Sequence, residues 1–512
     1  MTKLTIKRAL VSVSNKTNLH LLVGFFKKNN VHVLSTGGTF VHLKKLDPNL
    51  NLEQISKYTG FNEILDGRVK TLNPLIHGGI LAKKNDKTHL QQLKKNKILP
   101  IDLVVVNLYP FETVSKRKTA TEKECIENID IGGPTMIRAA AKNFENIAIL
   151  TQPNNYREFL DQLENNNELT LKYRKYLASL AFETTSYYEG IISNWFNKKS
   201  SHFCSNQTAI PIKKISNLRY GENPHQNATV YEFGQNSMTK ISGKDISFNN
   251  ICDLEIAMEL SEQFDLPACV ILKHGNPCGV ALHKNQDKAY SKALTCDPIS
   301  AFGGVIALNK PVTRNTSRLI VKTFTEVIIA PDFSSEALEI LSSKKNLILV
   351  KYKSSKRNIS KYIKSTRNFL LIQDRDEKIV KKNDLQFVTK LKPKKSDIDD
   401  MLFAFIVCKF VNSNAIVLAK NLTTLGIGVG QTNRLESAKL SIKNMKKNFK
   451  KVGAVMASDG FFPFPDIVEL CSNSKISAII QPGGSIQDKK VIEEAEKQKI
   501  PMAFTKTRHF KH

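Results

Sequence analysis

The sequence predicts an α/β protein of several domains. Short apolar runs of strand type alternate with stretches of helical periodicity, which is typical of βαβ units built around mostly parallel sheets. Polar loops that contain Gly follow several of the apolar runs directly. The chain of 512 residues exceeds what one hydrophobic core usually serves, so we expect two to four domains.

The N-terminal part, residues 1–150, alternates between strand and helix. Helices with apolar periodicity follow the first two of four expected strands, which are RALVSV (8–13), VHVL (31–34), DLVVVNL (102–108) and ENIAILT (145–151). This order predicts a doubly wound parallel sheet, in which ligands bind at the carboxyl ends of the strands. Residues 152–200 carry apolar side chains at three- and four-residue spacing, which predicts helices.

A domain boundary is expected in the polar stretch 198–214, which has no periodicity. Two αβ blocks follow, at 215–375 and from 385 to the end. Their expected strands include ACVIL (268–272), AIVLA (415–419), IGVG (427–430) and SAIIQP (477–482). An internal duplication would explain why both blocks place a Gly-containing loop after an apolar strand, although no fixed-period repeat is visible.

The net charge of +29 raises the question of nucleic acid as a partner. The lysines, however, are spread over the whole chain together with many Asn and Ile residues, and few aromatic residues lie near the basic runs. We therefore expect no nucleic-acid partner, and an anionic small substrate fits the charge equally well.

The eight cysteines are scattered without a CxxC pair, which suits a reducing compartment. No apolar run reaches the length of a membrane span, and the N-terminus is too short and strand-like for a signal peptide. These features predict a cytoplasmic protein without a membrane partner.

Two small-residue loops in the N-terminal part, SNKT (14–17) and STGGT (35–39), each follow a strand and open a helix. Backbone N–H groups at such a helix start bind anions. In GRVKTLNP (67–74), Arg68 and Lys70 alternate on an extended segment. Together the three segments predict a site for a phosphorylated substrate.

The run IDIGGPTMIRAAAKN (129–143) predicts a helix with Pro134 at its first position. Lys142 falls near the end of this helix. Judged from the run alone, it complements the partial negative charge of the helix C-terminus.

In ILKHGNPCGVA (271–281), Lys273 and His274 end an apolar strand beside a turn. A histidine can act as general base near neutral pH, and an adjacent lysine can stabilise an oxyanion. A zinc site would need a second cysteine after Pro277-Cys278, which is missing, whereas a Schiff-base lysine is neither supported nor excluded. The run GIGVGQTNR (426–434) has GxGxG rather than GxGxxG spacing, so it is a poor dinucleotide fingerprint.

Thirteen short motifs occur together in one order along the chain. They are SNKT, STGGT, GRVKTLNP, NLYPF, DIGGPTMIRAAAKN, RYGENPHQ, KHGNPCG, DPISAFGG, SNAIV, GIGVGQTNR, SDGFFPF, QPGGSI and a terminal RHFKH. On these motifs the sequence closely resembles the bifunctional AICAR formyltransferase/IMP cyclohydrolase family of purine biosynthesis, over essentially its full length.

The resemblance implies a methylglyoxal-synthase-like cyclohydrolase domain at residues 1–200. It also implies two cytidine-deaminase-like α/β subdomains without zinc, at 201–380 and 381–512, which form the formyltransferase. The implied reactions transfer a formyl group from 10-formyltetrahydrofolate to AICAR and then close the ring of the product, FAICAR, to give IMP. No catalytic metal is implied, and the formyltransferase sites of the family imply a homodimer.

For the formyltransferase, the resemblance implies His274 as the base, Lys273 as the oxyanion stabiliser and Asn414 as an orienting residue. The implied substrate-binding residues are Arg219, Tyr220, Gly303, Glu326, Arg434, Phe461, Asp466, Arg508 and His512. Pro465 departs from the pattern, because many relatives have a basic residue there.

For the cyclohydrolase, the resemblance implies Lys142 as the catalytic residue. This role replaces the one predicted from the helix alone, which is to complement the charge of the helix C-terminus. The implied substrate-binding residues are Ser14, Asn15, Lys16, Thr36, Gly37, Gly38, Thr39, Arg68, Val69, Lys70, Thr71, Asn107, Tyr109, Asp130 and Ile131.

Overall fold

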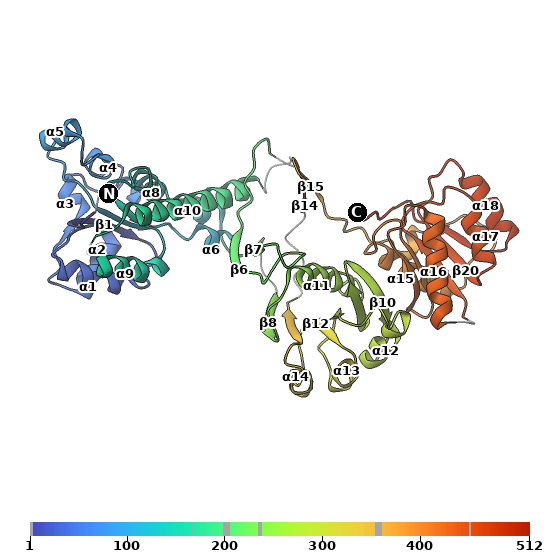
Figure 1. The fold of residues 1–512 in the computed structure, drawn as a ribbon. Coiled ribbons are helices and arrows are strands. Elements are labelled where there is room, and N and C mark those ends of the chain that lie inside the picture. The colour runs from blue at the N-terminus through green and yellow to red at the C-terminus, as the bar shows by residue number, and fades with distance from the viewer. Residues whose placement is uncertain (1–3, 167, 198–204, 234–237, 354–360, 450–451) are drawn as a thin grey trace. The chain divides into compact units, whose positions relative to one another are not determined.

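A computed structural model describes residues 4–512 apart from 167, 198–204, 234–237, 354–360 and 450–451 (Figure 1). The chain divides into two compact units, unit 1 (Met1–Ile212) and unit 2 (Lys213–His512). Among the described residues, none of the helices combines the length and apolar character that crossing a membrane requires.

Unit 1 is built on a five-stranded parallel sheet in the order β3-β2-β1-β4-β5. Its strands are β1 (Arg8–Val13), β2 (His32–Ser35), β3 (Leu52–Gln54), β4 (Leu103–Asn107) and β5 (Ala148–Leu150). Its helices are α1 (Leu19–Lys28), α2 (Gly37–Leu46), α3 (Ile55–Thr59), α4 (Pro74–Leu81), α5 (Lys87–Lys95), α6 (Phe111–Ser115), α7 (Glu122–Glu127), α8 (Gly132–Lys142), α9 (Tyr156–Asn166) and α10 (Leu171–Asn197).

Both faces of this sheet are covered. Successive residues of β1 point to opposite faces, and Ala9, Leu10 and Val11 are all fully buried. One core joins the strands to α1 and α9 and to α4, α8 and α10, and Figure 1 places β1 between these two groups of helices. The predicted doubly wound sheet and the predicted strand at residues 8–13 are confirmed.

Unit 2 contains two six-stranded mixed sheets. The first part has β8 (Met238–Ser242), α11 (Phe248–Ser261), β9 (Ala268–Lys273), β10 (Asn276–Leu282), α12 (Gln286–Cys296), β11 (Gly304–Leu308), α13 (Arg314–Ile320), β12 (Thr325–Ala330), α14 (Ser335–Ser342) and β13 (Ile348–Tyr352). The second has β16 (Gln386–Phe387), α15 (Lys395–Cys408), β17 (Ile416–Ala419), β18 (Thr424–Gly428), α16 (Arg434–Asn448), β19 (Ala454–Ser458), α17 (Asp466–Ser472), β20 (Ile476–Gln481), α18 (Asp488–Lys497) and β21 (Met502–Phe504). Two hairpins, β6 (Lys213–Asn217) with β7 (Thr229–Glu232) and β14 (Lys361–Ser365) with β15 (Leu370–Asp374), complete the unit.

The two parts repeat one topology, and we call them copy 1 (238–352) and copy 2 (386–504). Their sheets have the orders β10-β9-β11-β12-β13-β8 and β18-β17-β19-β20-β21-β16. In each copy the same two pairings are parallel and the other three are antiparallel. The duplication that the sequence left open is therefore present in the fold.

The copies meet along β10 and β18, and one core contains residues of both. Ala281 forms a bridge to Thr423, and the amide of Leu282 donates to the carbonyl of Leu422 (2.9 Å). Thr424 Oγ1 accepts from the amide of Val280 (2.9 Å).

Glycines on these two edge strands allow a helix to approach closely. A Cβ on Gly428 would lie 2.0 Å from the carbonyl oxygen of Ser437 on α16, and one on Gly279 would lie 2.0 Å from that of Ala293 on α12. Gly426 and Gly428, the first two glycines of GIGVG, therefore serve helix–strand packing and lie inside β18 rather than in a ligand loop.

Candidate active sites

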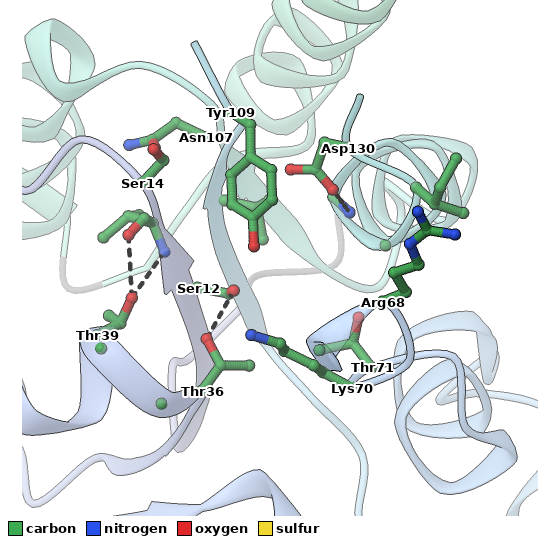
Figure 2. Close-up of a pocket in the computed structure, with 18 of the residues that line it drawn as sticks. Ser12, Ser14, Thr36, Thr39, Arg68, Lys70, Thr71, Asn107, Tyr109 and Asp130 are labelled. Carbon is green, nitrogen blue, oxygen red and sulfur yellow. Dashed lines mark hydrogen bonds between the residues drawn. The ribbon is translucent and has the colours of Figure 1, made fainter. Parts of the chain in front are cut away.

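A pocket of about 570 Å³ lies at the carboxyl ends of the strands of unit 1 (Figure 2). Segments that are far apart in the sequence line it: the loops after β1 and β2, the 66–71 segment, the end of β4 and the start of α8. Parallel strands end at the same sheet edge, so the predicted loops converge there.

Hydrogen bonds between these segments fix the pocket wall. Asn107 accepts from the amide of Asn15 through Oδ1 (2.8 Å) and donates to its carbonyl through Nδ2 (2.8 Å). Thr39 Oγ1 bonds both the amide and the carbonyl of Val13 (3.1 and 3.0 Å), and Ser12 Oγ lies 2.9 Å from Thr36 Oγ1. The bonds to Thr39 and Thr36 tie the start of α2 to β1 (Figure 2), and Gly37 and Gly38, the first two residues of this helix, line the pocket.

Cationic side chains of the pocket have acidic neighbours. Arg68 forms an ion pair with Glu127, and Lys70 Nζ lies 2.8 Å from Glu63 Oε1. Figure 2 shows the Lys70 ammonium directed toward Ser12 and Thr36. Glu127 and Glu63 were not predicted, because no sequence spacing relates them to their partners.

Asp130 is the acidic group at the α8 end of the pocket. Its Oδ1 accepts from the amide of Gly133 (2.7 Å), and burial raises the pKa of its carboxyl group above the ordinary value. The amide of Asp130 itself donates to the Tyr188 hydroxyl (2.9 Å). Because α8 begins at Gly132, Pro134 is its third residue, not its first as predicted.

A second pocket, of about 330 Å³, lies between the copies in unit 2 and contains Lys273 and His274. The turn predicted beside Lys273 and His274 is short. Only His274 and Gly275 form the turn, since β10 already begins at Asn276. Lys273 Nζ donates to the carbonyl of Phe302 (2.8 Å), and the His274 side chain is exposed.

A third pocket, of about 370 Å³, contains Asn414, Arg434, Phe461 and Asp466. Arg434 organises this pocket: its Nη2 donates to Asn414 Oδ1 (2.7 Å), its Nη1 donates to Ser458 Oγ (2.9 Å), and it forms an ion pair with Asp459. Asp459, with no exposed surface, was not predicted as a site residue although it lies in the motif SDGFFPF, because nothing in the sequence relates it to Arg434.

Hydrogen bonds between side chains and backbone join the segments that flank the second and third pockets. The amide of Asn412 donates to Asn276 Oδ1 (2.9 Å), and Lys511 Nζ donates to the carbonyls of Gly275 and Phe410 (both 3.1 Å). Within the described ranges, no group of three or more His, Cys, Asp or Glu side chains is placed to hold a metal ion.

Comparison with known proteins identifies the family. A family model described as "AICARFT/IMPCHase bienzyme" matches residues 140–444, and one described as "MGS-like domain" matches residues 19–135. A "Bifunctional purine biosynthesis protein PurH" from Caldicellulosiruptor bescii is 46% identical over 517 residues, covering 99% of this chain and 100% of the relative. The chain belongs to the AICARFT/IMPCHase bienzyme family.

Other relatives with the same printed name agree. The protein from Clostridium acetobutylicum is 46% identical over 512 residues, and that from Fusobacterium nucleatum is 42% identical over 511 residues; each alignment covers 99% of this chain and 100% of the relative. A solved structure titled "Crystal structure of ForH" has 32% identity and a TM-score of 0.34, covering 38% of this chain and 99% of that chain.

The family models and the full-length relatives confirm the predicted family, the methylglyoxal-synthase-like N-terminal domain and the bifunctional purine-biosynthesis activity.

Most cyclohydrolase residues that the resemblance implied come together in the unit 1 pocket. Those that line it are Ser14, Lys16, Thr36, Gly37, Gly38, Thr39, Arg68, Lys70, Thr71, Asn107, Tyr109, Asp130 and Ile131. Asn15 and Val69 are chain neighbours of lining residues, and Asn15 is held by Asn107.

Lys142 does not line this pocket. It is the exposed last residue of α8, whose first residue, Gly132, does line it. The length of the helix, with a rise of about 1.5 Å per residue, separates these ends by roughly 15 Å. The structure thus places Lys142 where the reading from the helix alone put it, at the helix C-terminus.

The formyltransferase residues that the resemblance implied are distributed more widely. Arg508 lies over the ring of Phe510 (4.7 Å), and Phe510 lines the third pocket and contacts His512 (5.9 Å between ring centroids). The remaining ones, Arg219, Tyr220, Gly303 and Glu326, line neither the second nor the third pocket. Glu326 pairs instead with Lys244 (2.6 Å).

Proposed function

We propose that the unit 1 pocket performs the IMP cyclohydrolase reaction on FAICAR and that unit 2 performs formyl transfer to AICAR. The observation that supports this most directly is the convergence of both small-residue loops with Lys16, Arg68 and Lys70 in one pocket. A phosphorylated nucleotide matches this chemistry, because helix N-termini and basic side chains both favour its phosphate group.

In ring closure, the carboxamide nitrogen of FAICAR attacks its own formyl carbon, and the hydroxyl on that carbon then leaves as water. The reaction is intramolecular, so holding the reacting atoms together supplies much of the rate enhancement. We assign stabilisation of the developing oxyanion to Lys70, which lines the pocket and whose ammonium is directed toward Ser12 and Thr36 (Figure 2). The Asp130 carboxylate is suited to accept the nitrogen proton because its raised pKa makes it a stronger base than an exposed carboxylate.

Lys142 lies at the end of α8 that is remote from the pocket, so the catalytic role that the resemblance implies for it would have to be exerted through the helix. We therefore test it separately and assign the charge inside the pocket to Lys70. Residues 1–200 carry this activity in our proposal, and 201–380 with 381–512 carry the other.

In formyl transfer, the 5-amino nitrogen of AICAR attacks the formyl carbon of a folate co-substrate, which we take to be 10-formyltetrahydrofolate. The bond between that carbon and N10 of the folate then breaks, and tetrahydrofolate leaves with the proton that the amine gave up. His274 accepts the amine proton, and Lys273 stabilises the tetrahedral oxyanion with an N–H that is not engaged by Phe302. Asn414 and Arg434 hold the nucleotide in the third pocket, which the Arg434 network keeps ordered. We further propose a cytoplasmic homodimer that needs no catalytic metal.

Two separate assays on the full chain test the division of labour. IMP formation from FAICAR reports the cyclohydrolase, and FAICAR formation from AICAR and 10-formyltetrahydrofolate reports the transferase. Lys70→Ala should lower only the first and His274→Ala only the second, each by ~100-fold, the range for loss of one charge-stabilising or acid–base group. If Lys70→Ala left the first rate unchanged, or His274→Ala the second, that residue's assignment would be wrong.

A further inference from the structure

The turn that carries His274 recurs in the second copy of the fold. His274 and Gly275 join β9 to β10 with φ angles of 52° and 75°. Asn421 and Leu422 join β17 to β18 with φ angles of 51° and 53°. Two successive residues with positive φ are typical of a type I′ hairpin turn.

An aspartate lies beneath each of these turns. Asp253 accepts from the amides of His274 (3.1 Å) and Gly275 (2.7 Å) through its two carboxylate oxygens. Asp400 accepts from the amides of Asn421 (2.8 Å) and Leu422 (2.7 Å) in the same way. Each aspartate is the sixth residue of a 14-residue helix, α11 or α15.

The copies differ in what the turn presents. In copy 1 it carries the imidazole of His274 into the pocket between the copies. In copy 2 the equivalent residue is Asn421, and the Leu422 carbonyl accepts from Leu282 of copy 1. The same kind of support, a helix aspartate that accepts from both turn amides, thus holds two different turns. The turn of copy 1 carries an acid–base group, and the turn of copy 2 packs the copies together.

All four backbone polar groups of the copy 1 turn have partners. Asp253 accepts from both amides, Asn276 Nδ2 donates to the His274 carbonyl (3.1 Å), and Lys511 Nζ donates to the Gly275 carbonyl (3.1 Å). Positive φ is unfavourable for a non-glycine residue such as His274 and persists only where surrounding contacts hold it. Asp253 supplies the two contacts that come from the helix beneath.

We propose that Asp253 is a positioning residue for formyl transfer, which fixes the turn that aims His274 at the amine. The proposal rests on the proposed role of His274 and adds a residue that does not contact the substrate itself. Charge-assisted bonds to both amides hold the backbone more firmly than neutral bonds would. A shift of about 1 Å in a catalytic group can cost ~100-fold in rate.

The duplication provides a matched control. Asp253→Asn and Asp400→Asn each exchange one carboxylate oxygen for an amide group that cannot accept from the turn, but only the first lies beneath a proposed base. We expect Asp253→Asn to lower kcat for formyl transfer by ~10- to 100-fold, with the KM for AICAR changed less than about threefold. Asp400→Asn should keep kcat within about threefold, even if its Tm falls further than that of Asp253→Asn.

Three readouts are taken on full-length protein: kcat and KM for formyl transfer, Tm, and the rate of IMP formation from FAICAR. An unchanged kcat in Asp253→Asn, or an equal loss in Asp400→Asn, would overturn the positioning role. If His274→Ala itself kept the formyltransferase rate, the assignment of the base would fail instead. Where Asp253→Asn does not fold, Asp253→Glu keeps the charge but displaces the carboxylate beneath the same two amides, and an unchanged kcat there would also contradict the proposal.

Discussion

Arg434 forms an ion pair with Asp459 inside copy 2, and the Asp459 side chain is 0% exposed. The same guanidinium holds Asn414, and Ser413 Oγ donates to Asp459 Oδ2 (2.5 Å). The buried ion pair therefore orders the third pocket, and each of its two charges depends on the other for compensation.

Asp459→Asn should destabilise unit 2. The substitution leaves the guanidinium of Arg434 buried without a countercharge, which typically costs about 3–5 kcal/mol. Chemical denaturation of the full-length protein would measure the change. The double variant Asp459→Asn/Arg434→Met should lose less stability than Asp459→Asn alone, and equal or greater loss in the double variant would contradict the unpaired-charge explanation.

Lys142→Ala tests whether the catalytic cation of the cyclohydrolase lies in the pocket, at Lys70, or at the C-terminus of α8, at Lys142. A cation at the C-terminus of α8 stabilises the helix by about 0.3–1 kcal/mol, so we expect a small fall in Tm and a cyclohydrolase rate lowered less than ~10-fold. Lys70→Ala should lower the same rate ~100-fold. A larger loss of rate in Lys142→Ala than in Lys70→Ala would reverse the assignment.

The pH dependence of the cyclohydrolase should reflect Asp130. Burial raises the pKa of its carboxyl group, so the carboxylate is lost on acidification at a higher pH than an ordinary aspartate would lose it. We expect the acid limb of kcat for IMP formation to lie above the ordinary aspartate range. Asp130→Asn should remove this limb and lower the plateau, and a limb that survives in the variant would belong to another group.

Lys511 should make unit 2 more stable as the pH rises. Burial lowers the pKa of its ammonium from 10.5 to about 8, so between about 8 and 10.5 the unfolded chain binds more protons at this site than the folded chain. Stability then rises with pH across that window, by on the order of 3 kcal/mol. Denaturation of the wild type and Lys511→Met at several pH values isolates this effect, because the other lysines titrate in both; parallel curves would refute it.

Much of unit 1 was predictable because its signals are local. Apolar runs such as residues 8–13 specify buried strands, and small residues after a strand specify loops at the sheet edge where ligands bind. The convergence of SNKT and STGGT follows from that geometry alone.

The features that were not predictable depend on contacts between distant residues. Glu127 meets Arg68 only because α7 returns to the pocket, and Asp459 meets Arg434 only across the sheet of copy 2. The two-residue turn at His274 was hidden because Asn, Pro and Gly are poor strand formers, yet Asn276–Leu282 pairs with β9. Gly279 is required in β10 by the approach of α12, which no local pattern records.

The contact of β10 with β18 also bears on how the chain avoids aggregation. Each of these strands ends its own sheet, and an open strand edge can pair with another molecule. In unit 2 the edge of each copy is covered by the other, through Leu282, Leu422 and Thr424. Each copy thus protects the open edge strand of the other. Separating the two copies would expose both edge strands, and each could then pair with strands of other molecules.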